Sequence, residues 1–122
     1  MNILTSKSHG VLDYIFSAFL LASPALFHME GSVSNITYAL GVAHLLITIL
    51  TRFEVGIIKL IPFRIHGLIE IAVALLLVGL AFWFNSQQND FGFYYYLAIA
   101  GIIMVVFVIT DFKTAPNQVS QS

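Results

Sequence analysis

Four long apolar runs constrain the fold of this 122-residue chain more than any other feature. They cover about residues 9–28, 35–51, 63–84 and 92–110, and each is close to the roughly 20 residues that a helix needs to cross a bilayer core. Lipid offers no partners for backbone N–H and C=O groups, and four spans cannot close a barrel, so the runs are predicted to be helices. The composition agrees, because 59% of the residues are hydrophobic and only 9% are charged, which is too apolar for an ordinary soluble domain.

Charge and cysteine content narrow the classes of function. The formal net charge is −1 and no basic run occurs, so no nucleic-acid partner is expected. The chain has no cysteine, which excludes disulfides, thiolate metal sites and cysteine nucleophiles. No Ser-His-Asp arrangement, phosphate-binding loop or pair of catalytic carboxylates can be argued from the spacing. We therefore expect neither an enzyme nor a cofactor.

All basic residues fall on one side of the predicted spans. They precede the first span, occupy the middle loop and follow the last span: Lys7, Arg52, Lys59, Arg64 and Lys113. The positive-inside rule therefore places both termini and the middle loop in the cytoplasm. Aromatic residues gather at the opposite interface, where they are expected to anchor the protein as a belt: Phe82, Trp83, Phe84, Phe91, Phe93, Tyr94, Tyr95 and Tyr96.

A short polar signature occurs twice, each time at the start of an apolar run. The first copy is Lys7-Ser8-His9-Gly10-Val11-Leu12-Asp13, and the second is Arg64-Ile65-His66-Gly67-Leu68-Ile69-Glu70. A shift of 57 residues aligns these copies, and a shift of 59 aligns Thr51-Arg52-Phe53-Glu54 with Thr110-Asp111-Phe112-Lys113. The difference of two residues falls in the outer loops, where insertions are well tolerated.

This duplication predicts the architecture of an all-α membrane protein. We expect one domain, 1–122, with four transmembrane helices arranged as two tandem helical hairpins. The repeats cover 5–54 and 62–113, and a polar tail follows at 114–122. Because each repeat crosses the membrane twice, both copies have the same topology. The expected symmetry is a pseudo-twofold axis along the membrane normal.

The two signatures also supply the candidate functional site. In each copy a histidine and an acid lie four residues apart, so they share one helix face and can hydrogen-bond. If the repeats pack symmetrically, both pairs face the bundle axis, and three further charged residues end spans at the same level. The expected polar cluster, just inside the cytoplasmic face, consists of His9, Asp13, His66, Glu70, Arg52, Arg64 and Asp111.

Three interpretations of this cluster stay open. It can be a structural network that fixes helix register and joins the repeats, which needs no chemistry because ionisable groups near span ends are less costly than at the midplane. It can be a site for protons, ions or a lipid headgroup. Two histidines and two carboxylates can also coordinate a divalent metal, but the spacing specifies none, so no metal site is predicted.

His44 is a separate candidate. It lies near the middle of the second span, where an ionisable group is costly and marks a functional hypothesis. The shift of 59 pairs it with Ile103, so it is not part of the duplicated design. Thr48, one turn further on, is expected to accept its proton. A neutral, hydrogen-bonded packing histidine is the structural alternative.

The signatures resemble those of a known family. A His-Gly-aliphatic-aliphatic-acidic start, a span ending in Ser23-Pro24 and a tandem hairpin duplication are similar to the SPW-repeat membrane proteins of bacteria. Ala25 stands where that family has tryptophan, and the second copy reads Gly79-Leu80-Ala81-Phe82-Trp83, without Ser-Pro. The resemblance implies a small multi-pass protein of the bacterial cytoplasmic (inner) membrane, in a family without an established biochemical role.

The expected function is therefore non-enzymatic. We expect a structural or accessory membrane component that acts through packing, with the lipid bilayer as its surroundings and a second copy or another membrane subunit as partner. The alternative is proton- or ion-coupled transport, or binding of a small ligand or lipid headgroup, at the cytoplasmic-side cluster of histidines and acids.

Overall fold

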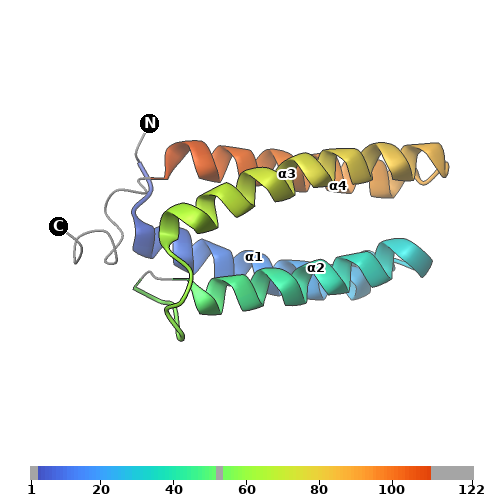
Figure 1. Cartoon of the computed structure of the whole chain (residues 1–122). Helices are drawn as coiled ribbons and strands as arrows, with labels where there is room; N and C mark the ends of the chain where they lie inside the picture. Colours follow the sequence, from blue (N-terminus) through green and yellow to red (C-terminus); the bar gives the residue numbers. More distant parts are fainter. Residues whose placement is uncertain (1–2, 52–53, 111–122) are drawn as a thin grey trace.

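The computed structural model describes residues 3–51 and 54–110, which form an all-helical fold (Figure 1). The helices are α1 (Ser6–Leu26), α2 (Gly31–Leu50), α3 (Phe63–Ser86) and α4 (Asp90–Ile109). Each is long and apolar enough to cross a membrane. The prediction of four such helices is confirmed, with ends that differ by a few residues from the apolar runs.

Side-chain caps define two of the helix starts. Thr5 is the N-cap of α1, where its hydroxyl accepts a hydrogen bond from the backbone N–H of Ser8 at 3.2 Å. Asn89 caps α4 in the same way and accepts from the N–H of Gly92 at 2.9 Å. Such caps satisfy donors that a helix leaves unpaired in its first turn.

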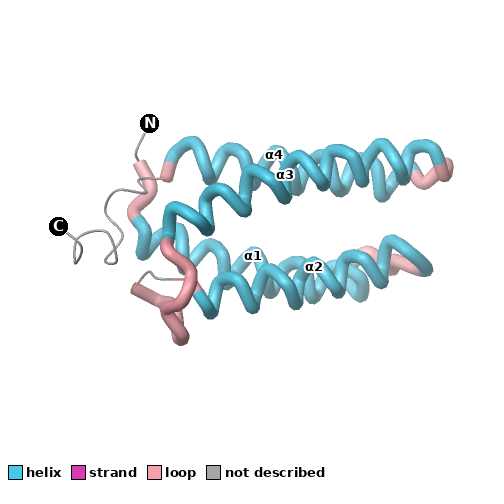
Figure 2. The backbone as a smooth tube through the Cα atoms, viewed as in Figure 1, coloured by secondary structure: helices cyan, strands magenta, loops and turns pink. Residues whose placement is uncertain are grey.

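The helices pack in two pairs, α1 with α2 and α3 with α4. Figures 1 and 2 show all four running lengthwise, with the start of α1, the connection between α2 and α3 and the end of α4 at the same end of the molecule. Within the first pair the backbones come close at Gly41, where a Cβ atom would lie 2.7 Å from Cδ2 of Leu21. A small residue at such a crossing is typical of helices packed in a membrane.

Backbone hydrogen bonds tie extended segments to the ends of α2 and α4, and two of them join matching positions. The N–H of Leu4 donates to the carbonyl of Ile109 at 2.8 Å, and the N–H of Ile61 donates to the carbonyl of Leu50 at 2.7 Å. The middle connection also contacts α1, because the hydroxyl of Tyr14 donates to the carbonyl of Val55 at 2.8 Å. These bonds hold both segments against the end of the molecule that carries the signatures.

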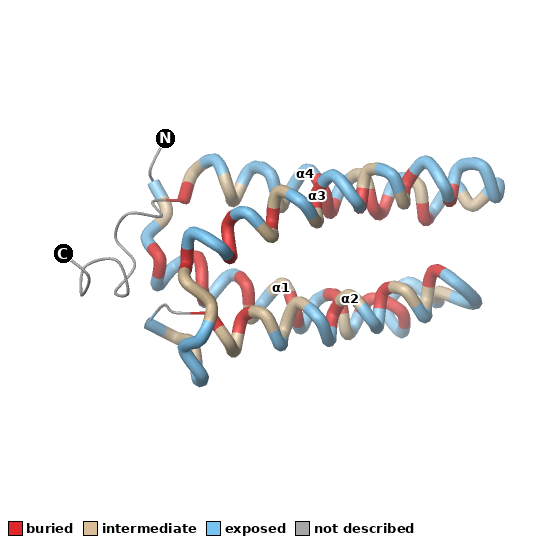
Figure 3. Tube along the Cα trace, viewed as in Figure 1, coloured by how far each residue is buried: buried red, intermediate tan, exposed pale blue. Residues whose placement is uncertain are grey.

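Apolar side chains occupy both the outer surface of the four helices and the interior between them. Figure 3 shows buried positions on the inner sides of the helices and exposed ones on the outer sides. Large apolar side chains stand exposed on each helix, as at Ile15, Leu46, Leu76 and Val105. The hydrophobic core consists of Leu20, Val33, Leu77, Ala81, Phe84, Tyr95, Tyr96, Ile99 and Ala100.

The aromatic residues near the outer turns divide between core and surface. Phe84 and Tyr96 are buried and stack with ring centroids 5.7 Å apart, and Tyr95 is buried beside them. Phe82, Trp83, Phe91 and Tyr94 are exposed. The expectation of a surface belt is therefore wrong for the three buried rings, whose periodic positions on α3 and α4 face the interior.

Candidate functional site

The structure brings four signature residues together between α1 and α3. His9 and Asp13 lie on the first turns of α1, and His66 and Glu70 lie at the matching positions of α3. Their exposed fractions are 0%, 4%, 1% and 8%, respectively. Because each histidine and its acid are one helical turn apart, both pairs point into the same space between the helices.

The shortest contacts in this cluster cross from one helix to the other. His9 Nε2 lies 2.8 Å from Glu70 Oε1, and His66 Nε2 lies 2.9 Å from Asp13 Oδ2. The contacts within one helix are longer, at 3.2 Å between His9 and Asp13 and 3.1 Å between His66 and Glu70. The Nε2 atom of each imidazole thus faces one carboxylate oxygen from each helix.

The other nitrogen of each imidazole contacts a threonine at a helix end. His9 Nδ1 lies 2.8 Å from Thr110 Oγ1, and His66 Nδ1 lies 2.8 Å from Thr51 Oγ1. Each threonine hydroxyl donates its own proton to the backbone carbonyl four residues earlier, at 2.5 Å for Thr110 and 2.6 Å for Thr51. The hydroxyl oxygen can therefore only accept from the ring, so Nδ1 carries a proton in both histidines.

This tautomer limits how the Nε2 atoms of His9 and His66 can interact with the carboxylates. With Nδ1 protonated, each Nε2 offers the carboxylates either a second proton or a lone pair. A lone pair facing a carboxylate at 2.8–3.2 Å would be repelled, so a positive charge has to lie between the nitrogen and the oxygens. A proton on each ring or a shared cation satisfies this requirement.

Of the remaining members of the predicted cluster, the structure describes Arg64. Arg64 is exposed on α3, because two residues along a helix turn the side chain about 200° away from His66. Arg64 therefore lies outside the group of four buried side chains. Arg52 and Asp111 lie outside the described residues.

His44 lies next to the cluster, on α2. Its Nδ1 is 2.7 Å from Ser17 Oγ, and its Nε2 is 3.7 Å from Asp13 Oδ1. Ser17 donates its proton to the carbonyl of Asp13 at 2.9 Å, so its oxygen accepts from the ring. The prediction that Thr48 accepts the proton is wrong, because Nδ1 of His44 contacts Ser17 instead, and the Thr48 hydroxyl donates to the backbone carbonyl of His44 at 2.8 Å.

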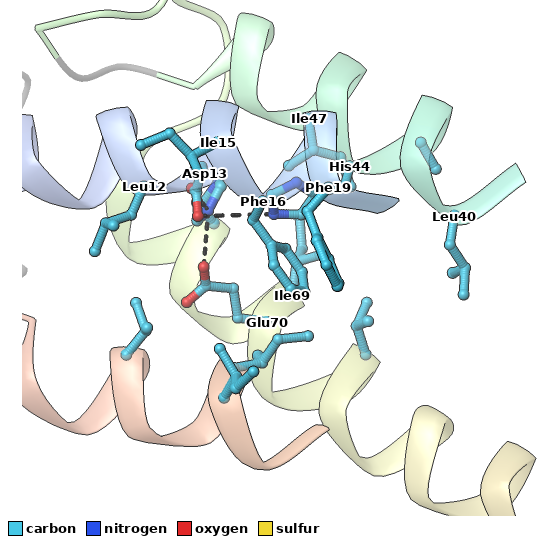
Figure 4. Close-up of a pocket in the computed structure, with 16 residues that line it drawn as sticks. Leu12, Asp13, Ile15, Phe16, Phe19, Leu40, His44, Ile47, Ile69 and Glu70 are labelled. Atoms are coloured by element: carbon cyan, nitrogen blue, oxygen red, sulfur yellow. Dashed lines mark hydrogen bonds and ion pairs between the residues drawn. The ribbon is translucent and has the colours of Figure 1, made fainter. Parts of the chain in front are cut away.

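A cavity of about 380 Å³ extends from the cluster between the helices. Figure 4 shows the side chains of Asp13, His44 and Glu70 close together in this cavity, with Leu40 away from them. Its walls come from all four helices and are otherwise apolar: Leu12, Ile15, Phe16, Phe19, Leu40, Ala43, Ile47, Ile69, Val73, Ile102, Ile103 and Val106. The cavity thus combines an apolar chamber with a few convergent polar groups, as ligand sites commonly do.

Sequence reasoning missed the threonines, the serine and the cavity. Thr51 and Thr110 carry a signal that was available, because the shift of 59 aligns them and places both where a span ends near the signature histidines. Ser17 and the cavity carry no such signal, since the contact of Ser17 depends on how α1 and α2 pack against each other and the cavity depends on how all four helices pack.

Comparisons with protein-family models, with curated proteins and with solved structures find no match for this chain. The function of the site is therefore inferred from its own geometry and chemistry.

Proposed function

We propose that this chain is a multi-pass protein of the bacterial cytoplasmic membrane with four spans and with both termini in the cytoplasm, related to the SPW-repeat proteins. The distribution of side chains supports insertion, because large apolar groups face outward on every helix while the histidines and acids of the signatures are buried. That distribution suits lipid as the surrounding solvent. The one-sided placement of the basic residues supports the orientation.

We further propose that the two helix pairs are tandem repeats related by a pseudo-twofold axis. The contacts of the site support this, because His9 pairs with Thr110 and His66 pairs with Thr51 at the same distance of 2.8 Å. The shift of 57 residues aligns His9 with His66, and the shift of 59 residues aligns Thr51 with Thr110. The two backbone bonds that tie the chain start and the middle connection to helix ends follow the same correspondence.

The role that this geometry supports best is that of a structural or accessory membrane component without catalytic activity, which associates with copies of itself or with another membrane subunit. One observation carries it: the signature side chains bind one another across α1 and α3 at 2.8 and 2.9 Å. Histidines and acids used in this way join the two halves and fix the register of the helices. The hydroxyls that contact the histidines within the described residues donate their protons to backbone carbonyls, so no ring nitrogen activates them as nucleophiles.

A second candidate function is transport of protons or ions, or binding of a small ligand, at the same cluster. The cavity favours it, because Asp13, His44, His66 and Glu70 line one continuous space of about 380 Å³. In proteoliposomes this candidate predicts a flux or a ligand affinity that disappears in Asp13→Asn and Glu70→Gln. The exposed Glu30→Gln variant is the matched control.

Topology tests the leading proposal directly. The chain has no cysteine, so single cysteines at the exposed positions Lys7 and Gln87 can be labelled in intact cells with a membrane-impermeant maleimide. We expect Gln87→Cys to react from outside and Lys7→Cys to react only after permeabilisation. The reverse pattern overturns the orientation, and equal labelling of both from outside overturns the four-span arrangement.

A further inference from the structure

We propose that the cluster of His9, Asp13, His66 and Glu70 is a binding site for one divalent transition-metal ion. The ligands are Nε2 of the two imidazoles and one oxygen of each carboxylate. The inference deepens the ion-binding candidate above and rests on the cluster itself, whatever role the membrane protein has as a whole.

The positions of the ligand atoms support a four-coordinate site. The four residues offer one ligand atom each, and these atoms all lie within 4.8 Å of one another. Their contacting N–O pairs are 2.8 to 3.2 Å apart. A tetrahedral zinc ion with bonds of about 2.0–2.2 Å separates its ligand atoms by roughly 3.3–3.6 Å. The contacting N–O pairs therefore need to lengthen by a few tenths of an ångström to admit the ion, and the other pairs, which lie within 4.8 Å, need to adjust to the same separation.

The outer hydrogen bonds of the histidines support the same assignment. A histidine that binds a metal almost always donates its other ring N–H to a neighbouring acceptor, which fixes the tautomer and the direction of the lone pair. Both histidines do this here, since each Nδ1–H donates to a threonine hydroxyl at 2.8 Å. The Nε2 atoms of both rings are thereby aimed at the space between the two carboxylates.

Charge gives a third, independent reason. Two neutral imidazoles and two carboxylates carry a charge of −2, and a buried charge needs a partner. The lysine and arginine side chains within the described residues, those of Lys7, Lys59 and Arg64, are exposed. One divalent cation neutralises the site, and the competing arrangement without metal is a proton on each ring.

The cavity offers the ion a path to the cluster, and Glu70, which lines it, offers a further ligand atom. Glu70 Oε2 is buried and has no hydrogen-bond partner among the described residues, which is unusual for a buried carboxylate oxygen. Glu70 lines the cavity, so this second oxygen is available to an ion that arrives from that side. Mixed imidazole and carboxylate ligands favour zinc, iron or manganese over copper(I), magnesium and calcium.

Metal content tests the proposal. The full-length protein is purified in detergent with a tag that contains no histidine, stripped with chelator, incubated with Zn²⁺ and desalted. Elemental analysis is expected to find about one zinc per chain and X-ray absorption to find nitrogen and oxygen neighbours at about 2.0–2.2 Å. The His9→Gln/His66→Gln double variant loses the metal, whereas His28→Gln, at an exposed position, keeps it.

A second variant guards against loss of metal through misfolding. Thr51→Val keeps all four ligands and removes only the acceptor for His66 Nδ1–H, and it should bind zinc about 10- to 100-fold more weakly. Zinc should raise the melting temperature of the wild-type protein, and it should do so less in this variant at the same concentration. Wild-type protein that stays free of metal, or zinc that binds equally well to the double variant, overturns the metal site. Both results leave the cysteine-labelling test of topology unaffected.

Discussion

The threonine that supports His66 offers a sharp test of the site, because a matched threonine lies three residues before it. Thr51 and Thr48 are both 0% exposed, and the hydroxyl of each donates to a backbone carbonyl four residues earlier. Only Thr51 also accepts from an imidazole, that of His66 at 2.8 Å. Replacement by valine keeps the shape of the side chain and removes the hydroxyl in both cases.

The structure sets the size of the expected effect. His66 is 1% exposed, so water cannot replace the lost acceptor, and a buried donor without a partner costs about 1–3 kcal/mol. Thr51→Val should lower the free energy of unfolding by that amount. Thr48→Val leaves no side-chain donor without an acceptor, so it should lower the free energy of unfolding by no more than about 0.5 kcal/mol. By the repeat relation, Thr110→Val should resemble Thr51→Val.

Unfolding by SDS titration in mixed micelles measures this difference. The chain has one tryptophan, so its fluorescence and far-ultraviolet circular dichroism report the transition in every variant without added probes. Chelator present throughout removes any contribution from metal. If Thr51→Val and Thr48→Val are equally stable, the hydrogen bond to His66 does not form as described, and the assignment of its tautomer fails with it.

Two further predictions concern the packing of the helices. Gly41→Ala places a Cβ atom 2.7 Å from Leu21 Cδ2 and 3.2 Å from the Leu21 backbone nitrogen. Because α1 has to move, the melting temperature should fall, with a loss of about 1–3 kcal/mol in the free energy of unfolding. Gly79→Ala, which has no atom within 4 Å of the new Cβ, should not lower the free energy of unfolding. Ala43→Leu adds apolar volume to the wall of the cavity and should raise stability by about 0.5–2 kcal/mol. Unchanged melting in Gly41→Ala, or a loss of stability in Ala43→Leu, would show that the close crossing or the open cavity is misplaced.

The helices could be predicted because the apolar runs are long, whereas their ends depend on other residues. The first run begins near residue 9, but α1 begins at Ser6 because Thr5 caps a turn that contains polar residues. Apolarity marks the stretch that suits a bilayer core, and hydrogen-bonded caps decide where a helix begins. α2 extends back to Gly31 although the side chain of its N-cap residue, Glu30, makes no capping hydrogen bond.

The core of the site could also be predicted, because helical spacing and the duplication limit where its residues point. A spacing of four places His9 with Asp13 on one face of α1, and the second signature repeats that face on α3. Partners contributed by other helices could not be predicted in this way. Thr48 is the polar neighbour of His44 along the chain, yet Ser17 on α1 is its partner in space. Neither periodicity nor the repeat offset indicates which side chains of neighbouring helices meet.

The coupling free energy between α1 and α3 shows whether the two signatures join the halves of the molecule. A double-mutant cycle with Asp13→Asn and His66→Gln, measured by SDS unfolding in the presence of chelator, isolates the contact that crosses α1 and α3 at 2.9 Å. A direct contact between Asp13 and His66 predicts a coupling free energy of about 1–3 kcal/mol. A cycle that pairs Asp13→Asn with His28→Gln, at an exposed position, should give none. A coupling between Asp13 and His66 that is zero within about 0.5 kcal/mol would contradict the claim that the signatures join the two halves.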